Sequence, residues 1–188
     1  LLMWVYGLIY IIIGSFAQEA VLLMASESYL SSWLYVPIMV FSIALKSPLY
    51  FYNNFLYYNK SKTKFIFITT VIGSVINIFI TFWLVPIYGI LGSIVADIIA
   101  IFVRLFIVIP VVYSDSKSVY SFVKFIVLSI VPMIFMAVAI IPSYSNVESF
   151  SWSNILYKIL VIFVYIGCVS LVYKEQMKRY MIAFFSHK

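Results

Sequence analysis

Apolar stretches of about 20 residues follow one another along this chain and constrain its fold more than any other feature. A helix of that length crosses the hydrocarbon core of a bilayer, where backbone groups find no partners except one another. The 188 residues are 65% hydrophobic and 10% charged, with a mean hydropathy of +1.14. A water-soluble domain of this size cannot cover so much apolar surface. We therefore expect an all-α, polytopic membrane bundle with six spans, at residues 1–24, 36–52, 65–84, 90–112, 120–141 and 155–173.

Lysine and arginine are concentrated on alternate connections between these spans. Such residues stay on the cytoplasmic side of short loops, so we expect a multi-pass protein of the cell inner (cytoplasmic) membrane with a cytoplasmic C-terminus. The placement also argues that the net charge of +6 reflects membrane orientation and not nucleic-acid binding. Trp33, Trp83 and Trp152 fall at the opposite ends of spans, where indole favours the headgroup region. The predicted cytoplasmic residues are Lys60, Lys62, Lys64, Lys117, Lys124, Lys174, Lys178, Arg179 and Lys188, against Lys158 on the other side.

The chain divides into a spanning region, residues 1–173, and a basic tail, residues 174–188. The tail carries apolar residues at helical spacing among its basic ones, which predicts a helix lying on the anionic inner leaflet; a solvated tail is the alternative. The first residue is a leucine inside an apolar run, without the basic start of a signal peptide. We therefore expect a fragment whose upstream part is missing. The apolar tail residues are Met177, Tyr180, Met181, Phe184 and Phe185.

Three charged residues lie inside the expected spans, where each costs about 2.5 to 3.5 kcal/mol on insertion scales. Asp97 and Arg104 share one helix face but lie about 10 Å apart along it, too far for a direct salt bridge, so we expect each to have other partners. Lys46 lies toward the cytoplasmic half of its span, where snorkelling to the interface is an alternative. Glu19, near the outer end of the first span, is expected to be an interfacial carboxylate.

Polar residues form a stripe on each of the second, third and fourth spans, and the stripes on the second and fourth spans include these three charges. The three stripes predict either a shared water-accessible cavity or hydrogen bonds that join the helices, and the pattern does not decide between them. They are Ser42, Lys46 and Asn53; Thr70, Ser74, Asn77 and Thr81; and Ser93, Asp97 and Arg104.

The link between the third and fourth spans is short and uncharged, which is typical of a tight hairpin. We expect Pro86 to end the third span by removing a backbone donor, and Gly89 to allow the reversal. Gly92 begins a four-residue spacing of small residues, with Ala96 and Ala100, that lets a neighbouring helix approach closely.

No catalytic constellation is visible. Cys168 is the only cysteine and His187 the only histidine, which excludes a disulfide framework, a thiolate cluster and histidine-based catalysis. No phosphate-binding glycine loop is present either. We therefore expect a protein that is not an enzyme and that has no cofactor or metal.

Asn77, followed by an apolar run and "VPIYGILGS" at residues 85–93, resembles a signature of polysaccharide-export proteins of the O-antigen flippase (Wzx) type. These belong to the MATE-like flippase superfamily. Residues 27–42 and 58–78 are similar to the corresponding stretches, whereas the last two spans agree only in hydropathy. Ser93 departs from the usual alanine. The resemblance implies that the chain is the C-terminal six-helix lobe of a two-lobe, twelve-span transporter.

That resemblance also implies a function, the translocation of undecaprenyl-diphosphate-linked oligosaccharide units for O-antigen or a related surface polysaccharide. The implied partners are the lipid-linked oligosaccharide, membrane lipids and other polysaccharide-assembly membrane proteins. Lys46 and Arg104 would meet the anionic headgroup, with Asp97 tuning Arg104 or binding a coupling ion. The alternatives are ion-coupled multidrug efflux or peptidoglycan-precursor flipping in the same superfamily, and, less expected, a membrane polysaccharide polymerase.

Overall fold

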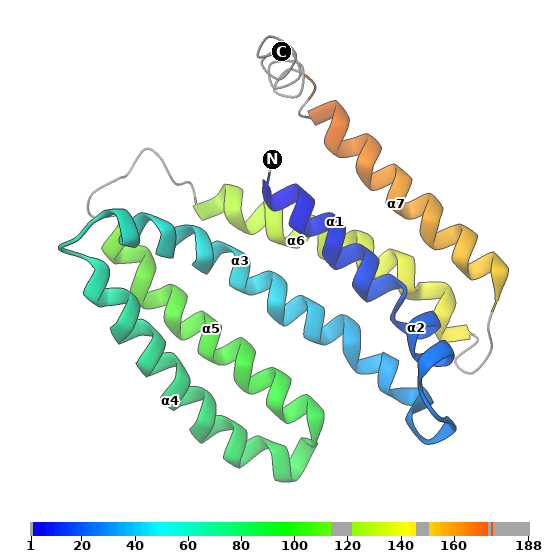
Figure 1. The fold of residues 1–188 in the computed structure, drawn as a ribbon, viewed down its shortest axis with the longest axis horizontal. Helices are drawn as coiled ribbons and strands as arrows, with labels where there is room; N and C mark the ends of the chain where they lie inside the picture. Colours follow the sequence, from blue (N-terminus) through cyan, green and yellow to red (C-terminus); the bar gives the residue numbers. More distant parts are fainter. Residues whose placement is uncertain (1, 114–121, 146–150, 173, 175–188) are drawn as a thin grey trace. The chain divides into compact units, whose positions relative to one another are not determined.

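The computed structural model describes residues 2–113, 122–145, 151–172 and 174, and among these it contains helices and no strand (Figure 1). Five helical segments are long and apolar enough to cross a membrane, and a bent helix pair makes a sixth if it counts as one span. The all-α prediction is therefore confirmed for the described residues, and the segments indicate a multi-pass membrane protein. The chain forms two compact units, Leu1–Ser31 with Val131–Lys188, and Ser32–Ile130.

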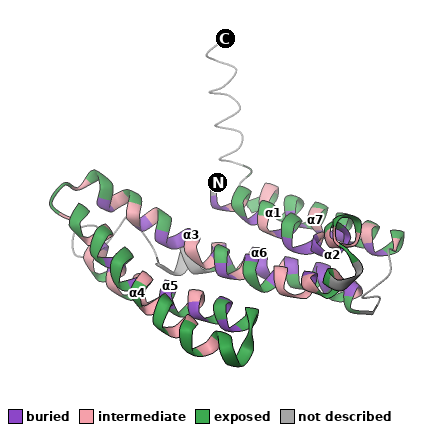
Figure 2. Cartoon of the chain, turned by 60° about the horizontal axis from the view of Figure 1, so that its bottom comes forward, coloured by how far each residue is buried: buried purple, intermediate pink, exposed green. Residues whose placement is uncertain are grey.

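The second unit is built on three long helices, α3 (Val36–Tyr58), α4 (Thr63–Tyr88) and α5 (Ile90–Tyr113), with α4 packed along α5 (Figure 1). Only 11% of the most apolar window of α4 is buried within the protein, and most of its surface is exposed in Figure 2. Because α4 is also strongly apolar, its outer surface fits a lipid environment. The core between α3 and α5 consists of Leu49, Tyr52, Leu56, Ile101, Leu105, Val108 and Val112.

The α4–α5 hairpin is tighter than predicted. Pro86 does not end the helix, because α4 continues through it to Tyr88. A proline in the last turn forfeits a single backbone hydrogen bond, and the reversal is made at Gly89 with φ +57°. A Cβ atom on Gly92 would lie 2.5 Å from the carbonyl oxygen of Leu84, so the close approach predicted for Gly92 is confirmed.

The α3–α4 connection is shorter than the sequence suggested, because α3 continues to Tyr58 and α4 starts at Thr63. Lys62, just before α4, donates from Nζ to the carbonyl oxygen of Val111 at 3.0 Å. Val111 lies in the last turn of α5, where carbonyl groups lack helical partners and a cation is favourable. This contact ties the basic connection to the end of α5.

The first unit contains a broken first span. Its helices are α1 (Leu2–Ser15) and α2 (Ala17–Met24), bent by 48° at Phe16, and α7 (Trp152–Val172). The span predicted at residues 1–24 is therefore bent, and it counts as one span only if both helices are taken together. Gly14 packs against Met136 and Gly7 against Pro132, and both neighbours lie in the part of α6 (Phe122–Ile140) that belongs to this unit. Short 3₁₀ helices, η1 (Glu27–Tyr35) and η2 (Ile141–Ser145), follow α2 and α6.

The tryptophans do not all behave as interfacial anchors. Trp83 and Trp152 are exposed, as expected of residues that face lipid headgroups, but Trp33 is only 1% exposed. Trp33 lies in η1, where a loop was expected, and packing within the protein buries the ring. The predicted amphipathic helix of the tail lies outside the described residues, apart from Lys174 at its start.

Candidate functional site

A polar cavity of about 360 Å³ lies between α3, α4 and α5. It is lined by polar side chains from all three helices and by the apolar residues Met39, Ile43 and Ile94. The three predicted stripes therefore meet around a common space only in part, and direct hydrogen bonds between the helices are present as well. The stripe residues outside the lining are Asn53, Thr70, Ser74, Thr81 and Arg104. The polar lining residues are Ser42, Lys46, Asn77, Ser93 and Asp97.

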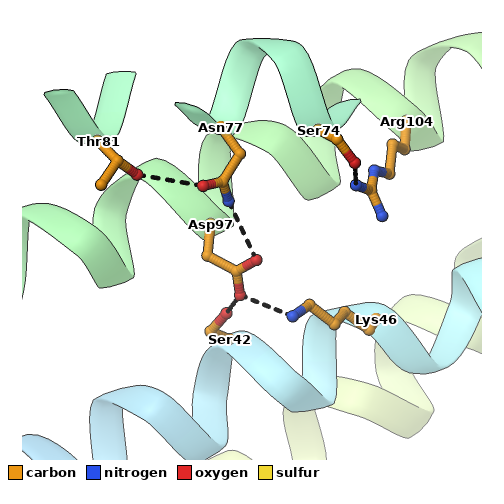
Figure 3. Close-up of polar contacts among 7 residues, drawn as sticks. All are labelled: Ser42, Lys46, Ser74, Asn77, Thr81, Asp97 and Arg104. Atoms are coloured by element: carbon orange, nitrogen blue, oxygen red, sulfur yellow. Dashed lines mark hydrogen bonds and ion pairs between the residues drawn. The ribbon is translucent and has the colours of Figure 1, made fainter. Parts of the chain in front are cut away.

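Asp97 is the centre of the hydrogen-bond network in this cavity (Figure 3). One carboxylate oxygen, Oδ2, accepts the Ser42 hydroxyl and lies 2.8 Å from Nζ of Lys46. The other oxygen, Oδ1, accepts the amide of Asn77 at 3.5 Å. Thr81 donates to the amide oxygen of Asn77 at 3.1 Å, which turns the amide nitrogen toward Asp97. The side chains of Lys46 and Asp97 remain 27% and 31% exposed, so the ion pair is not sealed within the protein.

Arg104 points to a different partner on α4. Its terminal nitrogen donates to the Ser74 hydroxyl at 3.2 Å, while its buried Nε has no hydrogen-bond partner. The expectation that Asp97 and Arg104 take separate partners is confirmed. The direct partner of Asp97 is Lys46.

Gly73 is a residue of this site that the sequence did not reveal. It is buried, and a Cβ atom placed on it would lie 2.0 Å from Nε of Arg104. The arginine side chain therefore lies flat against the backbone of α4, which only glycine allows. Thr70, which was included in the α4 stripe, is exposed, and the neighbouring Thr69 is buried and donates to the carbonyl of Ile66. The stripe on α4 is therefore shorter than predicted.

A second ion pair lies in the first unit, between α2 and α7. Nζ of Lys158 is 2.6 and 2.8 Å from the two carboxylate oxygens of Glu19, and the ring of Phe16 lies 5.9 Å from the same nitrogen. Lys158 is fully buried and Glu19 is 8% exposed. The prediction that Glu19 is an interfacial carboxylate was wrong. Burial against a carboxylate also explains why Lys158 departs from the alternation of basic residues.

The charged side chains of α3, α4 and α5 bear on which molecules the cavity can bind. Beyond the first turn of α4, the charged side chains of α3, α4 and α5 are Lys46, Asp97 and Arg104. The three helices therefore carry a net charge of one positive unit at the depth of apolar spans. Such charges, rare in membrane helices, mark sites for ions or polar substrates.

The fold and the site together indicate a multi-pass helical membrane protein with a polar cavity, lined by a lysine–aspartate ion pair, in one of its two units. Comparisons with protein-family models, with curated proteins and with solved structures gave no match for this chain. Its function must therefore be argued from the cavity itself and from the residue pattern around it.

Proposed function

We propose that this chain forms part of a flippase that moves an anionic, lipid-linked oligosaccharide from the inner to the outer leaflet of the cytoplasmic membrane. The observation that carries this proposal is the polar cavity with the Lys46–Asp97 ion pair in its lining, set among helices whose outer surfaces are apolar; Arg104 adds a second cation on α5, outside that lining. A diphosphate and its sugars cannot enter hydrocarbon without replacement of their hydration. Hydroxyl, amide and cationic groups supply that replacement.

The net positive charge also favours an anionic substrate over a cationic drug. The cavity's carboxylate, Asp97, is already engaged by Lys46, whereas the guanidinium of Arg104 has the Ser74 hydroxyl as its partner. A cationic drug would meet an acid already neutralised by Lys46, with a further positive charge, Arg104, on the same helices. This arrangement supports flipping of a diphosphate-linked lipid over multidrug efflux.

A separate apolar cavity of about 370 Å³ suits the hydrocarbon part of such a substrate. It is lined chiefly by Phe41, Leu45 and Pro48 of α3 and by Phe102, Phe106 and Ile109 of α5. The same two helices thus carry polar residues toward one cavity and apolar residues toward another. An amphiphile needs both kinds of surface close together.

The assignment to O-antigen flippases in particular is supported by the resemblance of Asn77 and residues 85–93 to the signature of that family. On this proposal the cargo is an undecaprenyl-diphosphate-linked repeat unit, and the chain acts with a second lobe. Rocking of the two lobes would open the cavity to each side in turn. The isolated lobe should therefore be inactive in transport.

The proposed orientation places the basic α3–α4 connection in the cytoplasm and the α4–α5 turn outside. Lys62 and Tyr88 lie at opposite ends of α4, which is 26 residues or about 39 Å long. With the native cysteine replaced, Lys62→Cys should react with an impermeant maleimide only after the cells are opened, whereas Tyr88→Cys should react in intact cells. Reaction of both from the same side would contradict the proposed threading.

The functional test uses the full-length protein in cells that depend on it for surface polysaccharide. The double variant Lys46→Met/Arg104→Gln should abolish surface polysaccharide while the protein remains in the membrane at normal level. The matched control Lys60→Gln/Lys64→Gln also removes two cations, but from exposed positions at the α3–α4 connection. Normal polysaccharide from the first variant, or equal loss from both, would refute the role of the cavity.

A further inference from the structure

We propose that the polar cavity between α3, α4 and α5 is a sugar site, which holds a neutral ring of the cargo through its hydroxyl groups and leaves the diphosphate outside. This inference rests on the proposed function, because it assigns one part of the lipid-linked oligosaccharide to this cavity. It concerns the lining alone, whose polar residues are Ser42, Lys46, Asn77, Ser93 and Asp97.

The charges of the lining cancel each other. Lys46 and Asp97 are its charged residues, and Nζ of the lysine lies 2.8 Å from Oδ2 of the aspartate. A phosphate bound to Lys46 would lie beside the carboxylate and be repelled by it, whereas a cation bound to Asp97 would be repelled by the ammonium. A neutral ligand avoids both penalties. The lining therefore favours a polar molecule, or part of a molecule, that carries no charge.

Both members of the ion pair retain hydrogen-bonding capacity (Figure 3). An ammonium has three N–H donors, and Lys46 directs one of them to Asp97. A carboxylate has about four acceptor positions, and the contacts of Asp97 with Lys46, Ser42 and Asn77 occupy three of them. Donors and an acceptor that no described side chain uses therefore lie next to each other.

The rest of the lining adds further groups of both kinds. One N–H of the Asn77 amide remains after the other meets Asp97, and the exposed Ser93 hydroxyl makes no hydrogen bond to the described residues. Each hydroxyl of a sugar ring both donates and accepts. One hydroxyl can therefore accept from Lys46 while its neighbour on the ring donates to Asp97.

The size and the apolar part of the cavity also suit a sugar ring. Its volume of about 360 Å³ is near the lower end of small-molecule sites, which range from about 300 to 1,000 Å³. A single ring suits this volume better than a long oligosaccharide does. The C–H groups of a ring need apolar contacts, and the lining supplies them from Met39, Ile43 and Ile94.

The test compares short-chain isoprenyl diphosphate diesters that carry the same charge but differ in the second ester group. Three probes carry glucose, galactose or N-acetylglucosamine, and a fourth carries a methyl group. The full-length protein is held in nanodiscs of zwitterionic lipid, so that bilayer anions do not compete. At least one sugar probe should bind the wild type roughly tenfold more tightly than the methyl probe does, which corresponds to one or two net hydrogen bonds.

Two variants test whether this gain arises in the cavity. Asp97→Asn keeps the shape of the side chain but replaces a charge-assisted hydrogen bond with a neutral one, and should reduce the gain to about threefold or less. Ser93→Ala removes an exposed hydroxyl and should reduce the gain by a similar factor, with binding of the methyl probe unchanged. The matched control Ser170→Ala removes a hydroxyl from α7, outside the second unit, and should keep the full gain.

The outcomes separate this inference from the proposed function. Equal binding of all four probes by the wild type would overturn the inference and leave anion transport intact. The same conclusion would follow if both cavity variants kept the full gain. Ser93→Ala provides the test by itself if Asp97→Asn fails to fold. Failure of the wild type to bind any of the four diphosphate probes would overturn the proposed function and the inference with it.

Discussion

The buried pair of Glu19 and Lys158 makes a quantitative prediction about stability. Both carboxylate oxygens lie within hydrogen-bond distance of Lys158 Nζ, and the lysine is fully buried. Removal of one partner leaves an uncompensated buried charge, which costs about 3 to 5 kcal/mol. Lys158→Met should therefore lower the free energy of unfolding by about that amount, because Glu19 would remain buried without its partner.

Removal of both charges should lower the free energy of unfolding much less than removal of one. The double variant Glu19→Met/Lys158→Met replaces the pair with apolar groups of similar length, and such replacements of buried ion pairs are close to neutral or stabilising. We therefore expect the double variant to recover most of the stability that each single variant loses. The coupling energy of this double-mutant cycle should be several kcal/mol.

The assay is unfolding in mixed micelles with increasing sodium dodecyl sulfate, followed by tryptophan fluorescence and helical circular dichroism. Unfolding free energies of the wild type, both single variants and the double variant complete the cycle. Additive losses would show that the two residues do not act as a pair. Losses below about 1 kcal/mol in both single variants would show that the site is hydrated, since only exposed pairs are worth so little.

Three further changes test individual contacts. Gly92→Ala should destabilise the protein by about 1 to 3 kcal/mol, because the new methyl group meets helix backbone that cannot move. Gly167→Ala places its methyl group in open space and should not destabilise the protein. Unfolding in the same micelles compares the two variants. On the proposed function, Gly73→Ala should displace the Arg104 side chain and weaken anion binding as much as Arg104→Gln does. Binding of a short-chain isoprenyl diphosphate monosaccharide to the protein in nanodiscs of zwitterionic lipid measures this effect. Lys62→Gln removes the cation at the end of α5 and should cost about 0.3 to 1 kcal/mol of unfolding free energy.

Hydropathy and helical spacing predicted the long helices and the polar faces of α3, α4 and α5. These features are local, because apolar length determines a span and a period of 3.6 residues determines a face. The close packing at Gly92 was also visible, since its partner lies in the adjacent helix of a short hairpin. Spacing along α5 further showed that Asp97 and Arg104 lie too far apart for a direct pair.

Partners distant in sequence were not predictable. Glu19 and Lys158 are separated by 139 positions, and nothing in either helix indicates that the two charges meet. The break at Phe16 has no proline to mark it, and the prediction at Pro86 failed because a proline in a last turn can be tolerated. Gly73 gave no signal, because the need for glycine arises from an arginine on the next helix. The misses at Glu19, Lys158 and Gly73 concern contacts that only the assembled helices create.

The single residue between α4 and α5 has a mechanical consequence. Gly89 is the whole of that link, and the Gly92 backbone lies directly against the end of α4. Helices α4 and α5 must therefore move as one rigid body, since neither can slide or pivot without breaking their shared contacts. The buried core between α3 and α5 and the Lys46–Asp97 ion pair hold this pair of helices to α3 as well. If the proposed transport requires bending, we therefore expect it outside these three helices.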